Sequence, residues 1–258
     1  MDLNKKTYSS KKVISYYEKY ESLQKPEQQI FSLLKNKFSE MKMLDIGIGA
    51  GRTTAHFAPC VKEYVGVDYV AGMVEASKNK FENKFPQSVF QVADARKLNQ
   101  FNEHEFDFVL FSFNGIDYIP TDERFLVFQQ INRVLKHGGY FCFSSHNIQS
   151  LEKPAKFKLR LNLFALLKQL IVWQKVKKIN KQKFTEIKTS EFVSINDGAH
   201  NFGLQTYYFR PSAQQKILYE TGFKNIRFFS LDTGLEIDNE SISKSTDRWI
   251  YYLCQKNQ

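Results

Sequence analysis

The chain has 258 residues, of which 42% are hydrophobic, and a formal net charge of +10. This composition supports a sizeable globular core and excludes a disordered chain. The start, residues 1–15, is polar and rich in lysine, unlike a signal peptide, and no stretch approaches the roughly 18 uncharged residues that cross a bilayer. We therefore expect a cytoplasmic protein. Three widely spaced cysteines, Cys60, Cys142 and Cys254, favour buried thiols over a disulfide or a zinc site.

The first forty residues are expected to be helical. Pro26 is a favourable first residue of a helix. The apolar residues that follow it recur at helical spacing, at Ile30, Leu33, Leu34 and Phe38.

Residues 41–54 form the stretch around which the chain is organised. An apolar run at 43–46 predicts a buried strand, and the glycines that follow, at 47, 49 and 51, permit a sharp turn into a helix that ends before Pro59. Backbone without Cβ atoms can approach a ligand closely, and the first turn of a helix offers free N–H donors. We therefore expect a nucleotide-like ligand here, although a purely structural turn remains an alternative.

The spacing of the glycines argues against a dinucleotide. The third glycine, Gly51, comes one residue too early for the Gly-x-Gly-x-x-Gly fingerprint. Arg52 stands where that fingerprint requires glycine or alanine. A pyrophosphate ligand is therefore disfavoured.

Further strands are predicted at 64–67, 89–92, 106–111 and 140–144. Helices are predicted at 71–85 and 122–135, and the second of these is expected to stop at the glycines of residues 136–139. Five strands that alternate with helices predict a parallel, doubly wound α/β sheet.

Acidic residues follow two of these strands. Asp68 comes at the carboxyl end of the second strand, next to the glycine loop, where a carboxylate can accept both hydroxyl hydrogens of a ribose. Taken alone, Asp68 could equally be a solvated acid at a strand end. Asp94 follows the third strand.

In order, the pieces of residues 41–147 resemble the core of class I S-adenosylmethionine-dependent methyltransferases. The matching pieces are Leu-Asp-Ile-Gly-Ile-Gly-Ala-Gly, Val-Gly-Val-Asp, Ala-Asp-Ala, Phe-Asp-Phe-Val and Arg-Val-Leu-Lys-His-Gly-Gly. The resemblance implies a Rossmann-like, seven-stranded, mostly parallel sheet in the order 3-2-1-4-5-7-6 with helices on both faces. A helix at 211–221 and strands at 223–229 and 249–253 fit the end of that fold.

The resemblance also implies a domain organisation. Residues 1–40 would form an N-terminal helical lid, residues 41–147 and 209–258 the core, and residues 148–208 an insertion that caps the substrate side. Tyr16, Tyr17 and Tyr20 resemble an aromatic lid over the cofactor, although a simple amphipathic helix explains them equally well.

The cofactor implied by the resemblance is S-adenosylmethionine, with S-adenosylhomocysteine as its product. Asp68 would hold the ribose and Asp94 the adenine amino group. The full set of implied cofactor residues is Tyr17, Tyr20, Asp45, Gly47, Gly49, Gly51, Asp68, Tyr69, Met73, Asp94, Ala95 and Phe113.

Candidates for catalysis follow the fourth and fifth strands, because α/β sheets place their sites at the carboxyl ends of strands. Methyl transfer from a sulfonium requires alignment, a dry site, and a base where the nucleophile carries a proton. His146 could be that base, or a hydrogen-bonding scaffold residue. Expected substrate-binding residues are Asn114, Asp117, Tyr118, Asn147, Tyr207, Tyr208 and Arg210.

The insertion carries nearly all of the positive charge excess. Residues 151–188 contain eleven lysines and arginines against two acids. Apolar residues on one helical stripe predict a capping helix that packs on the core, with its lysines in solvent. The stripe consists of Leu159, Leu163, Leu166, Leu170 and Trp173. Membrane-surface contact through residues 155–178, or RNA binding, is the alternative.

These observations favour an enzyme that methylates an oxygen or nitrogen atom of a small molecule. An RNA or protein methyltransferase that uses the basic insertion is one alternative, and a nucleotide-binding Rossmann protein without methyl transfer is another. Nucleic acid is not the expected partner, because Trp173 lies among leucines rather than on an exposed stacking surface. The sequence leaves the acceptor and the oligomeric state open.

Overall fold

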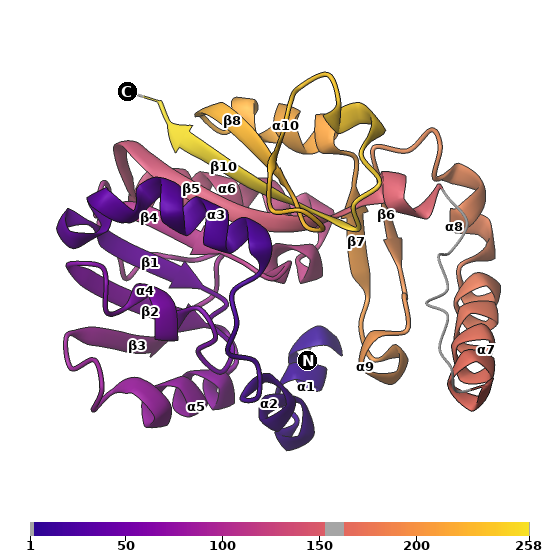
Figure 1. Cartoon of the computed structure of the whole chain (residues 1–258), viewed down its shortest axis with the longest axis horizontal. Coiled ribbons are helices and arrows are strands. Elements are labelled where there is room, and N and C mark those ends of the chain that lie inside the picture. Colours follow the sequence, from indigo (N-terminus) through magenta and orange to yellow (C-terminus); the bar gives the residue numbers. More distant parts are fainter. Residues whose placement is uncertain (1–2, 153–162, 258) are drawn as a thin grey trace.

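A mixed β-sheet runs through the molecule (Figure 1). The structure, a computed structural model, describes residues 3–152 and 163–257. Within them the strand order is β3-β2-β1-β4-β5-β10-β8-β9, with β7 paired to β5 and β6 paired to β7. The strands are β1 (Lys42–Ile46), β2 (Glu63–Asp68), β3 (Ser88–Val92), β4 (Phe106–Phe111), β5 (Leu135–Asn147), β6 (Phe192–Ile195), β7 (Thr206–Phe209), β8 (Phe223–Ser230), β9 (Glu236–Ile237) and β10 (Trp249–Lys256).

Helices flank the sheet and connect its strands. The α-helices are α1 (Leu3–Tyr8), α2 (Lys11–Tyr17), α3 (Lys25–Leu34), α4 (Thr54–Phe57), α5 (Ala71–Phe81), α6 (Thr121–Val134), α7 (Leu163–Ile179), α8 (Lys181–Glu186), α9 (Ala199–Phe202) and α10 (Pro211–Glu220). Four short 3-10 helices complete the described elements: η1 (Lys35–Glu40), η2 (Gly115–Tyr118), η3 (Ile148–Leu151) and η4 (Ile242–Lys244).

The two faces of the sheet pack against different helices, because alternate residues of each strand point to opposite faces. On one face Leu44 and Phe111 pack with side chains of α6 and α10. On the other face Met43 and Phe108 pack with side chains of α3, η1, α4 and α5. The predicted doubly wound α/β arrangement is therefore present.

The predicted strand order is contained in the observed one. Strands β3, β2, β1, β4 and β5 are parallel, and β10 lies antiparallel between β5 and β8. The predicted number of strands is wrong: the described residues hold ten rather than seven. Strand β9 extends the β8 edge, and the insertion contributes the hairpin of β6 and β7.

Strand β5 begins earlier than the sequence predicts. Helix α6 ends at Val134, and β5 starts at the next residue, so Gly138 and Gly139 lie inside the strand. The register with β4 shifts between Phe106 and Phe108, where the longer β5 segment has to bulge. The positive φ of Gly138, 72°, permits this irregularity. We expected these glycines to end the preceding helix in a turn. This prediction is wrong, because both glycines lie inside β5.

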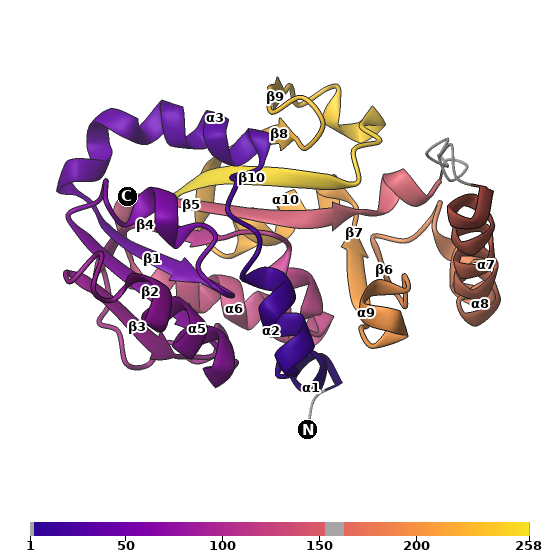
Figure 2. The same ribbon diagram turned by 60° about the horizontal axis from the view of Figure 1, so that its bottom comes forward.

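The N-terminal residues divide into two parts. Helices α1 and α2 lie between the glycine-loop end of the sheet and the turn at α9 (Figure 2). Helix α3 instead packs on the sheet through Ile30 and Leu34, which are buried with residues of β1 and β4. The expected lid of residues 1–40 is therefore too long, because residues 25–40 belong to a helical layer of the core.

The insertion returns to the sheet before α10. Strand β7 runs parallel to the end of β5, with His146 opposite Tyr208. Helix α7 lies on the outer side of the β6–β7 hairpin, at the edge of the molecule (Figure 1). Of the predicted helical stripe, Leu170 and Trp173 are half-buried, and Leu159 lies outside the described residues.

Candidate active site

A pocket lies at the carboxyl ends of the first four strands. It is lined by the loop after β1, by the residues after β2, β3 and β4, and by tyrosines of α1 and α2. The predicted residues that line it are Tyr17, Asp45, Gly47, Gly49, Asp68, Tyr69, Met73, Asp94, Ala95, Phe113 and Tyr118. The pocket lining does not include Tyr20, Gly51, Asn114, Asp117, His146, Asn147, Tyr207, Tyr208 or Arg210.

The glycine loop is held against β2 by backbone hydrogen bonds. The N–H of Gly47 donates to the Val67 carbonyl at 2.7 Å, and the N–H of Gly49 donates to the Asp68 carboxylate at 3.0 Å. Both glycines have positive φ, 67° and 55°, which an L side chain rarely adopts. The loop conformation therefore requires glycine at both positions.

Gly51 serves packing rather than the pocket. A Cβ atom there would collide with the ring of Phe81 and approach Ser77 Oγ to 3.1 Å. The same serine donates from its hydroxyl to the carbonyl of Gly49 at 2.8 Å. The third glycine of the motif thus allows α5 to pack closely against the loop.

Asp68 is buried at the floor of the pocket. Its carboxylate accepts the backbone N–H of Gly49 at 3.0 Å and that of Val70 at 2.9 Å. Burial raises its pKa to about 6, against the opposing effect of these backbone hydrogen bonds. The donors to this carboxylate described above are neutral backbone N–H groups. Its oxygens are therefore good acceptors for the hydroxyl groups of a ligand in the pocket.

Asp45 lies beside the loop and is tied to it. Its Oδ2 accepts the hydroxyls of Thr53 at 2.6 Å and of Tyr64 at 2.7 Å. Burial raises the pKa of Asp45 to about 7, although both hydrogen bonds act in the opposite direction. Asp45 therefore fixes the start of α4 relative to β1 and β2.

Asp94 has a charged partner that the sequence did not indicate. Arg96 donates to its carboxylate from Nε at 2.9 Å and from Nη2 at 2.5 Å, and also forms an ion pair with Glu123. Burial raises the pKa of Asp94, but the hydrogen bonds from Arg96 outweigh it and hold the pKa below its usual value. An adenine amino group would have to share this carboxylate with Arg96.

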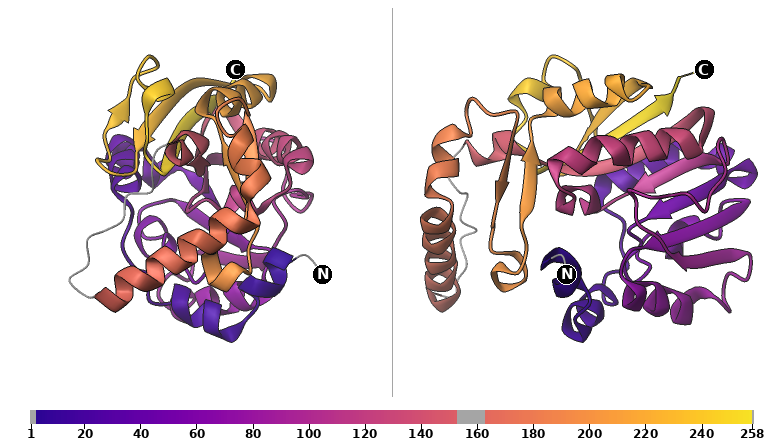
Figure 3. Two further views of the ribbon diagram at one scale, coloured as in Figure 1. Left: turned by 90° about the vertical axis from the view of Figure 1, so that its right-hand side faces the viewer. Right: turned by 180° about the vertical axis from the view of Figure 1, so that it is seen from behind.

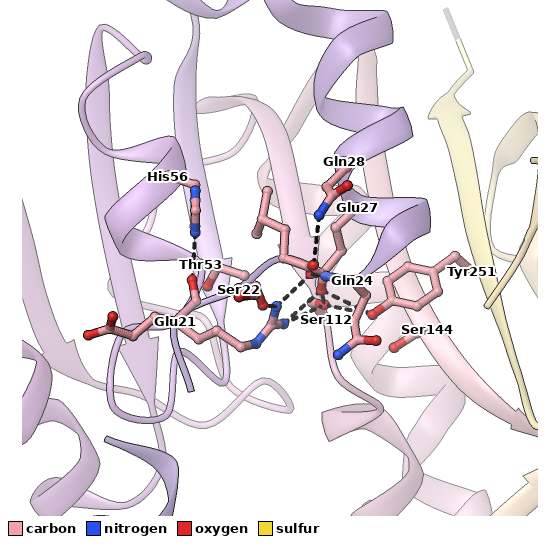
Figure 4. Close-up of polar contacts among 12 residues, drawn as sticks. Glu21, Ser22, Gln24, Glu27, Gln28, Thr53, His56, Ser112, Ser144 and Tyr251 are labelled. Carbon is pink, nitrogen blue, oxygen red and sulfur yellow. Dashed lines mark hydrogen bonds and ion pairs between the residues drawn. The ribbon is translucent and has the colours of Figure 1, made fainter. Parts of the chain in front are cut away.

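A second ion pair, also missed from the sequence, joins Arg52 to Glu27, whose surroundings are shown in Figure 4. Arg52 contacts Glu27 through two hydrogen bonds, Nη1 to Oε2 at 2.5 Å and Nη2 to Oε1 at 2.7 Å. The Glu27 carboxylate also accepts the hydroxyls of Ser112 and Tyr251 and the backbone N–H of Gln24. Burial raises the pKa of Glu27, but these partners, Arg52 above all, hold it below the usual value.

This cluster joins three parts of the chain. Glu27 belongs to the first turn of α3, Arg52 follows the glycine loop, and Ser112 follows β4. Arg52 also donates to the carbonyl of Ser22 at 3.2 Å. The only sequence signal for Glu27 was its place three residues after Gln24, which is typical of a helix-capping acid.

Aromatic side chains cover the open side of the pocket. The rings of Tyr17 and His200 are stacked with centroids 6.1 Å apart, and Tyr8 lies edge-on to Tyr118 at 5.3 Å. Burial raises the pKa of Tyr17 to about 12. Since His200 belongs to α9, the insertion contacts the N-terminal helices through this turn.

His146 belongs to a buried polar cluster next to the pocket. Asp117 accepts its backbone N–H at 2.5 Å and its ring Nδ1–H at 2.8 Å. Asp117 also accepts from Arg124 at 3.0 Å and from Ser145 at 2.7 Å, and its side chain is fully buried. Asp117 was predicted to bind substrate, but its carboxylate accepts hydrogen bonds from the protein residues around it instead.

Rings connect this cluster with the pocket. Trp249 lies between the two, with ring centroids 5.6 Å from His146 and 5.1 Å from Phe113. Tyr208 packs on the other side of His146 at 4.6 Å, and its hydroxyl donates to Asp197 at 3.1 Å. His146 is therefore one aromatic layer away from the pocket lining.

The remaining predicted residues lie around this region. Asn114 is buried and its backbone N–H donates to Ser144 Oγ at 2.8 Å. Tyr20 lies beside the pocket, with its ring 6.0 Å from that of Phe113. Tyr207 is half-buried in β7, opposite Ser194.

Two predicted substrate residues serve loops instead. Asn147 donates from its side chain to the carbonyls of Ser245 at 3.0 Å and Asp247 at 3.1 Å. Arg210 donates to Glu152 at 2.9 Å and to backbone carbonyls of the insertion. These contacts hold the loop before β10 and the base of the insertion in place.

Comparison with known proteins agrees with this geometry. Residues 43–139 match the family model of the methyltransferase domain. An uncharacterized methyltransferase of Bacillus subtilis, YcgJ, is 35% identical over 109 residues, which cover 42% of this chain and 42% of the length of that relative.

Two solved structures with low sequence identity share the fold. An S-adenosylmethionine-dependent methyltransferase of Mesorhizobium loti has a TM-score of 0.61 and 14% identity, over 90% of this chain and 98% of that chain. A 1,6-didemethyltoxoflavin-N1-methyltransferase of Burkholderia thailandensis, solved with 1,6-didemethyltoxoflavin and S-adenosylhomocysteine, has a TM-score of 0.56 and 13% identity, over 90% of this chain and 79% of that chain. The chain therefore contains a methyltransferase domain, over residues 43–139, and has the α/β fold of class I S-adenosylmethionine-dependent methyltransferases.

Proposed function

We propose that the chain transfers a methyl group from S-adenosylmethionine to an oxygen or nitrogen atom of a small-molecule acceptor. One observation carries the proposal: a single pocket joins the glycine loop after β1, Asp68 after β2 and Asp94 after β3. Bound S-adenosylmethionine supplies a methyl group on a positively charged sulfur, already activated for in-line displacement. The protein then has to align the acceptor, exclude water and take up a proton where the acceptor carries one.

The charges of the pocket support this cofactor over a dinucleotide. Asp45, Asp68 and Asp94 all border the pocket and suit a cationic ligand with hydroxyl groups. Its two arginines, Arg52 and Arg96, are both in ion pairs with acids. A pyrophosphate would meet three carboxylates and no uncompensated arginine among the described lining residues.

We assign the ends of the cofactor accordingly. The loop at Gly47 and Gly49 would hold the methionine part, Asp68 the ribose hydroxyls, and Asp94 the adenine side. Tyr17 would close over the cofactor from α2, since its ring lies 3.9 Å from the position of a Cβ atom at Gly49.

We propose that His146, which lies behind Trp249 and outside the described pocket lining, accepts a proton from the acceptor through a bridging water molecule. A carboxylate accepts hydrogen bonds but does not donate them, so Asp117 holds the proton of His146 on Nδ1 and leaves a lone pair on Nε2. Asp117 is thereby a positioning residue. Its negative charge is balanced in the resting state by Arg124, 3.0 Å away.

The acceptor would bind between Phe113, Tyr118 and the turn at α9. Aromatic rings border this side of the pocket and exclude water around a flat or apolar acceptor. In this proposal the cap of the insertion is α9, with His200 stacked on Tyr17, rather than α7. The basic residues of α7 are not part of the described pocket lining, so we do not favour the RNA or protein methyltransferase alternative.

Methyl-labelled S-adenosylmethionine tests the proposal. The full chain is incubated with the labelled cofactor and, in parallel, with a small-molecule extract, bulk RNA and a denatured protein extract. We expect label in the small-molecule fraction, and at least about tenfold less of it with the Asp68→Ala variant at a subsaturating concentration of the cofactor. Enzyme-dependent label in RNA or protein alone would contradict the proposed acceptor class.

A further inference from the structure

Helix α7 is apolar on two sides. On its inner side Val176 is buried, and Leu170 and Trp173 are half-buried. On its outer side Leu167 and Ile171 are 50% and 65% exposed. Residues four positions apart share one face of a helix, so these two side chains form one outward patch. Ile179, 53% exposed, extends the patch toward the end of the helix, whereas Val172 packs inward near Gly198.

The position of α7 leaves this patch open. The view from that side shows α7 crossing the front of the molecule, with the β6–β7 hairpin and the N-terminal helices behind it (Figure 3). An amphipathic helix normally has a polar outer face. The exposed apolar side chains of Leu167 and Ile171 depart from that pattern, and such exposed apolar surface is typical of an interaction site.

The charge of the helix indicates what binds there. Residues 163–179 contain no aspartate or glutamate. Lys175, Lys177 and Lys178 are exposed near its C-terminal end, and Lys181 and Lys183 follow in α8. The ammonium groups of Lys175 and Lys177 lie over the rings of Phe202 and Trp173, and that of Lys183 donates to the carbonyl of Ser194. The surface thus combines exposed apolar side chains with a run of cations.

We propose that the outer face of α7, defined by Leu167, Ile171 and Ile179 with the exposed lysines at its end, docks on an anionic lipid bilayer. Its apolar side chains would enter the boundary between headgroups and acyl chains, and its lysines would contact lipid phosphates. Among the described residues, no helix is long and apolar enough to cross a membrane. The helix would therefore lie in the plane of the membrane surface.

Other occupants fit this face less well. A second copy packed through the same face would bring the lysines of both copies together without an acid on either helix, and like charges repel. A nucleic acid would pair with the lysines but would leave the aliphatic side chains of Leu167 and Ile171 against phosphates. An anionic bilayer satisfies both kinds of side chain. This proposal goes beyond the proposed methyl transfer and does not depend on it.

Vesicle flotation of the full chain tests the proposal. The probes are vesicles of phosphatidylcholine alone and of phosphatidylcholine with 30% phosphatidylglycerol, at low and high salt. We expect binding to the anionic vesicles, weaker binding at high salt, and little binding to the neutral vesicles. Failure of the unaltered chain to bind anionic vesicles at low salt would overturn the proposal.

Two sets of variants separate the two contributions. Lys175→Gln with Lys177→Gln and Lys178→Gln should reduce partitioning into anionic vesicles about 100-fold. Leu167→Ser with Ile171→Ser should reduce it at least about tenfold while the lysines remain. Both sets lie outside the described pocket lining, so S-adenosylhomocysteine binding should not change.

Matched controls carry the same chemical change elsewhere. Lys35, Lys216 and Lys244 are exposed lysines on other helices, and Leu126 and Leu235 are exposed leucines. Replacing the control lysines by glutamine, or the control leucines by serine, should leave partitioning within about twofold of the unaltered chain. An equal loss in a control set would show that binding is not localised to α7 and would overturn the proposal.

The other occupants are distinguished in the same preparations. A dimer that Leu167→Ser with Ile171→Ser dissociates, without vesicle binding, would assign the face to a second copy. Salt-sensitive RNA binding that requires the α7 lysines, without vesicle binding, would assign it to nucleic acid. Either result would overturn the proposal of a lipid surface.

Discussion

Arg52 and Glu27 form a buried, two-pronged ion pair that links the residue after the glycine loop to the first turn of α3. The Glu27 side chain is fully buried, and that of Arg52 is 9% exposed. Neither charge could remain buried without its partner. The pair therefore makes the position of the pocket loop depend on α3, which packs on the sheet.

Loss of one partner should destabilise the whole domain. Glu27→Gln leaves the Arg52 cation uncompensated and should lower the free energy of unfolding by about 3–5 kcal/mol, measured by chemical denaturation. Glu27→Gln combined with Arg52→Met removes both charges and should recover part of that loss. If the double variant loses as much unfolding free energy as the two single variants lose in sum, or more, the coupling is contradicted.

The affinity for S-adenosylhomocysteine should depend on the charge of Asp68. Burial raises the pKa of this carboxyl to about 6 in the free protein, and hydrogen bonds from ribose hydroxyls would lower it. Binding then favours the ionised form, so affinity should fall as the pH falls through 6, by up to about tenfold per pH unit. Calorimetry between pH 5 and 8 measures this, and Asp68→Asn should remove the dependence. An unaltered pH profile in that variant would place the titrating group elsewhere.

Gly49 and Gly138 offer a matched test of the loop. Both have positive φ, 55° and 72°, so valine strains either position by about 1–3 kcal/mol. The Gly49→Val variant should fold and lose S-adenosylhomocysteine binding, because its side chain fills the approach to the loop. Gly138→Val, where a Cβ atom has nothing within 4 Å, should show a similar thermal midpoint and full binding. Equal affinities of the two variants for S-adenosylhomocysteine would show that the ligand does not bind at the glycine loop.

Asp117→Asn should slow turnover without weakening cofactor binding in the folded protein, and should lower the free energy of unfolding by about 3–5 kcal/mol because it leaves the buried Arg124 cation uncompensated. An asparagine amide can donate to His146 Nδ1, which moves the ring proton to Nε2 and removes the proposed base. We expect kcat to fall about 100-fold and the affinity for S-adenosylhomocysteine to stay within about twofold. Either role lowers the melting temperature, but a purely structural role would leave the pH profile of kcat unchanged. That profile, measured with an acceptor found by the labelling screen, decides between the two roles.

Local patterns predicted the part of the site that depends on strand ends. The run at 43–46 and the glycines after it set the loop, and parallel strands bring Asp68 and Asp94 to the same edge. Such features follow from residue spacing alone, because each lies within one strand and the turn after it. Most pocket residues that follow β1, β2 and β3 could therefore be predicted from the sequence.

Contacts between distant parts of the chain could not be predicted in the same way. Glu27 and Arg52 are separated by 25 positions, and neither has a pattern that identifies the other. The pairing of Asp117 with His146 depends on how η2 packs against β5, and the turn at α9 meets Tyr17 through tertiary structure. The glycines at 138 and 139 were misread because glycine permits a helix stop and a strand bulge equally.

The most direct test of the central claim is calorimetric titration of the full chain with S-adenosylmethionine, S-adenosylhomocysteine and NADH. The account predicts saturable binding of both S-adenosyl compounds, a loss on the order of 1.5–3 kcal/mol of binding free energy for S-adenosylhomocysteine with Asp68→Ala, and no binding of NADH. NADH binding without heat from either S-adenosyl compound would contradict the account and identify the pocket as a dinucleotide site.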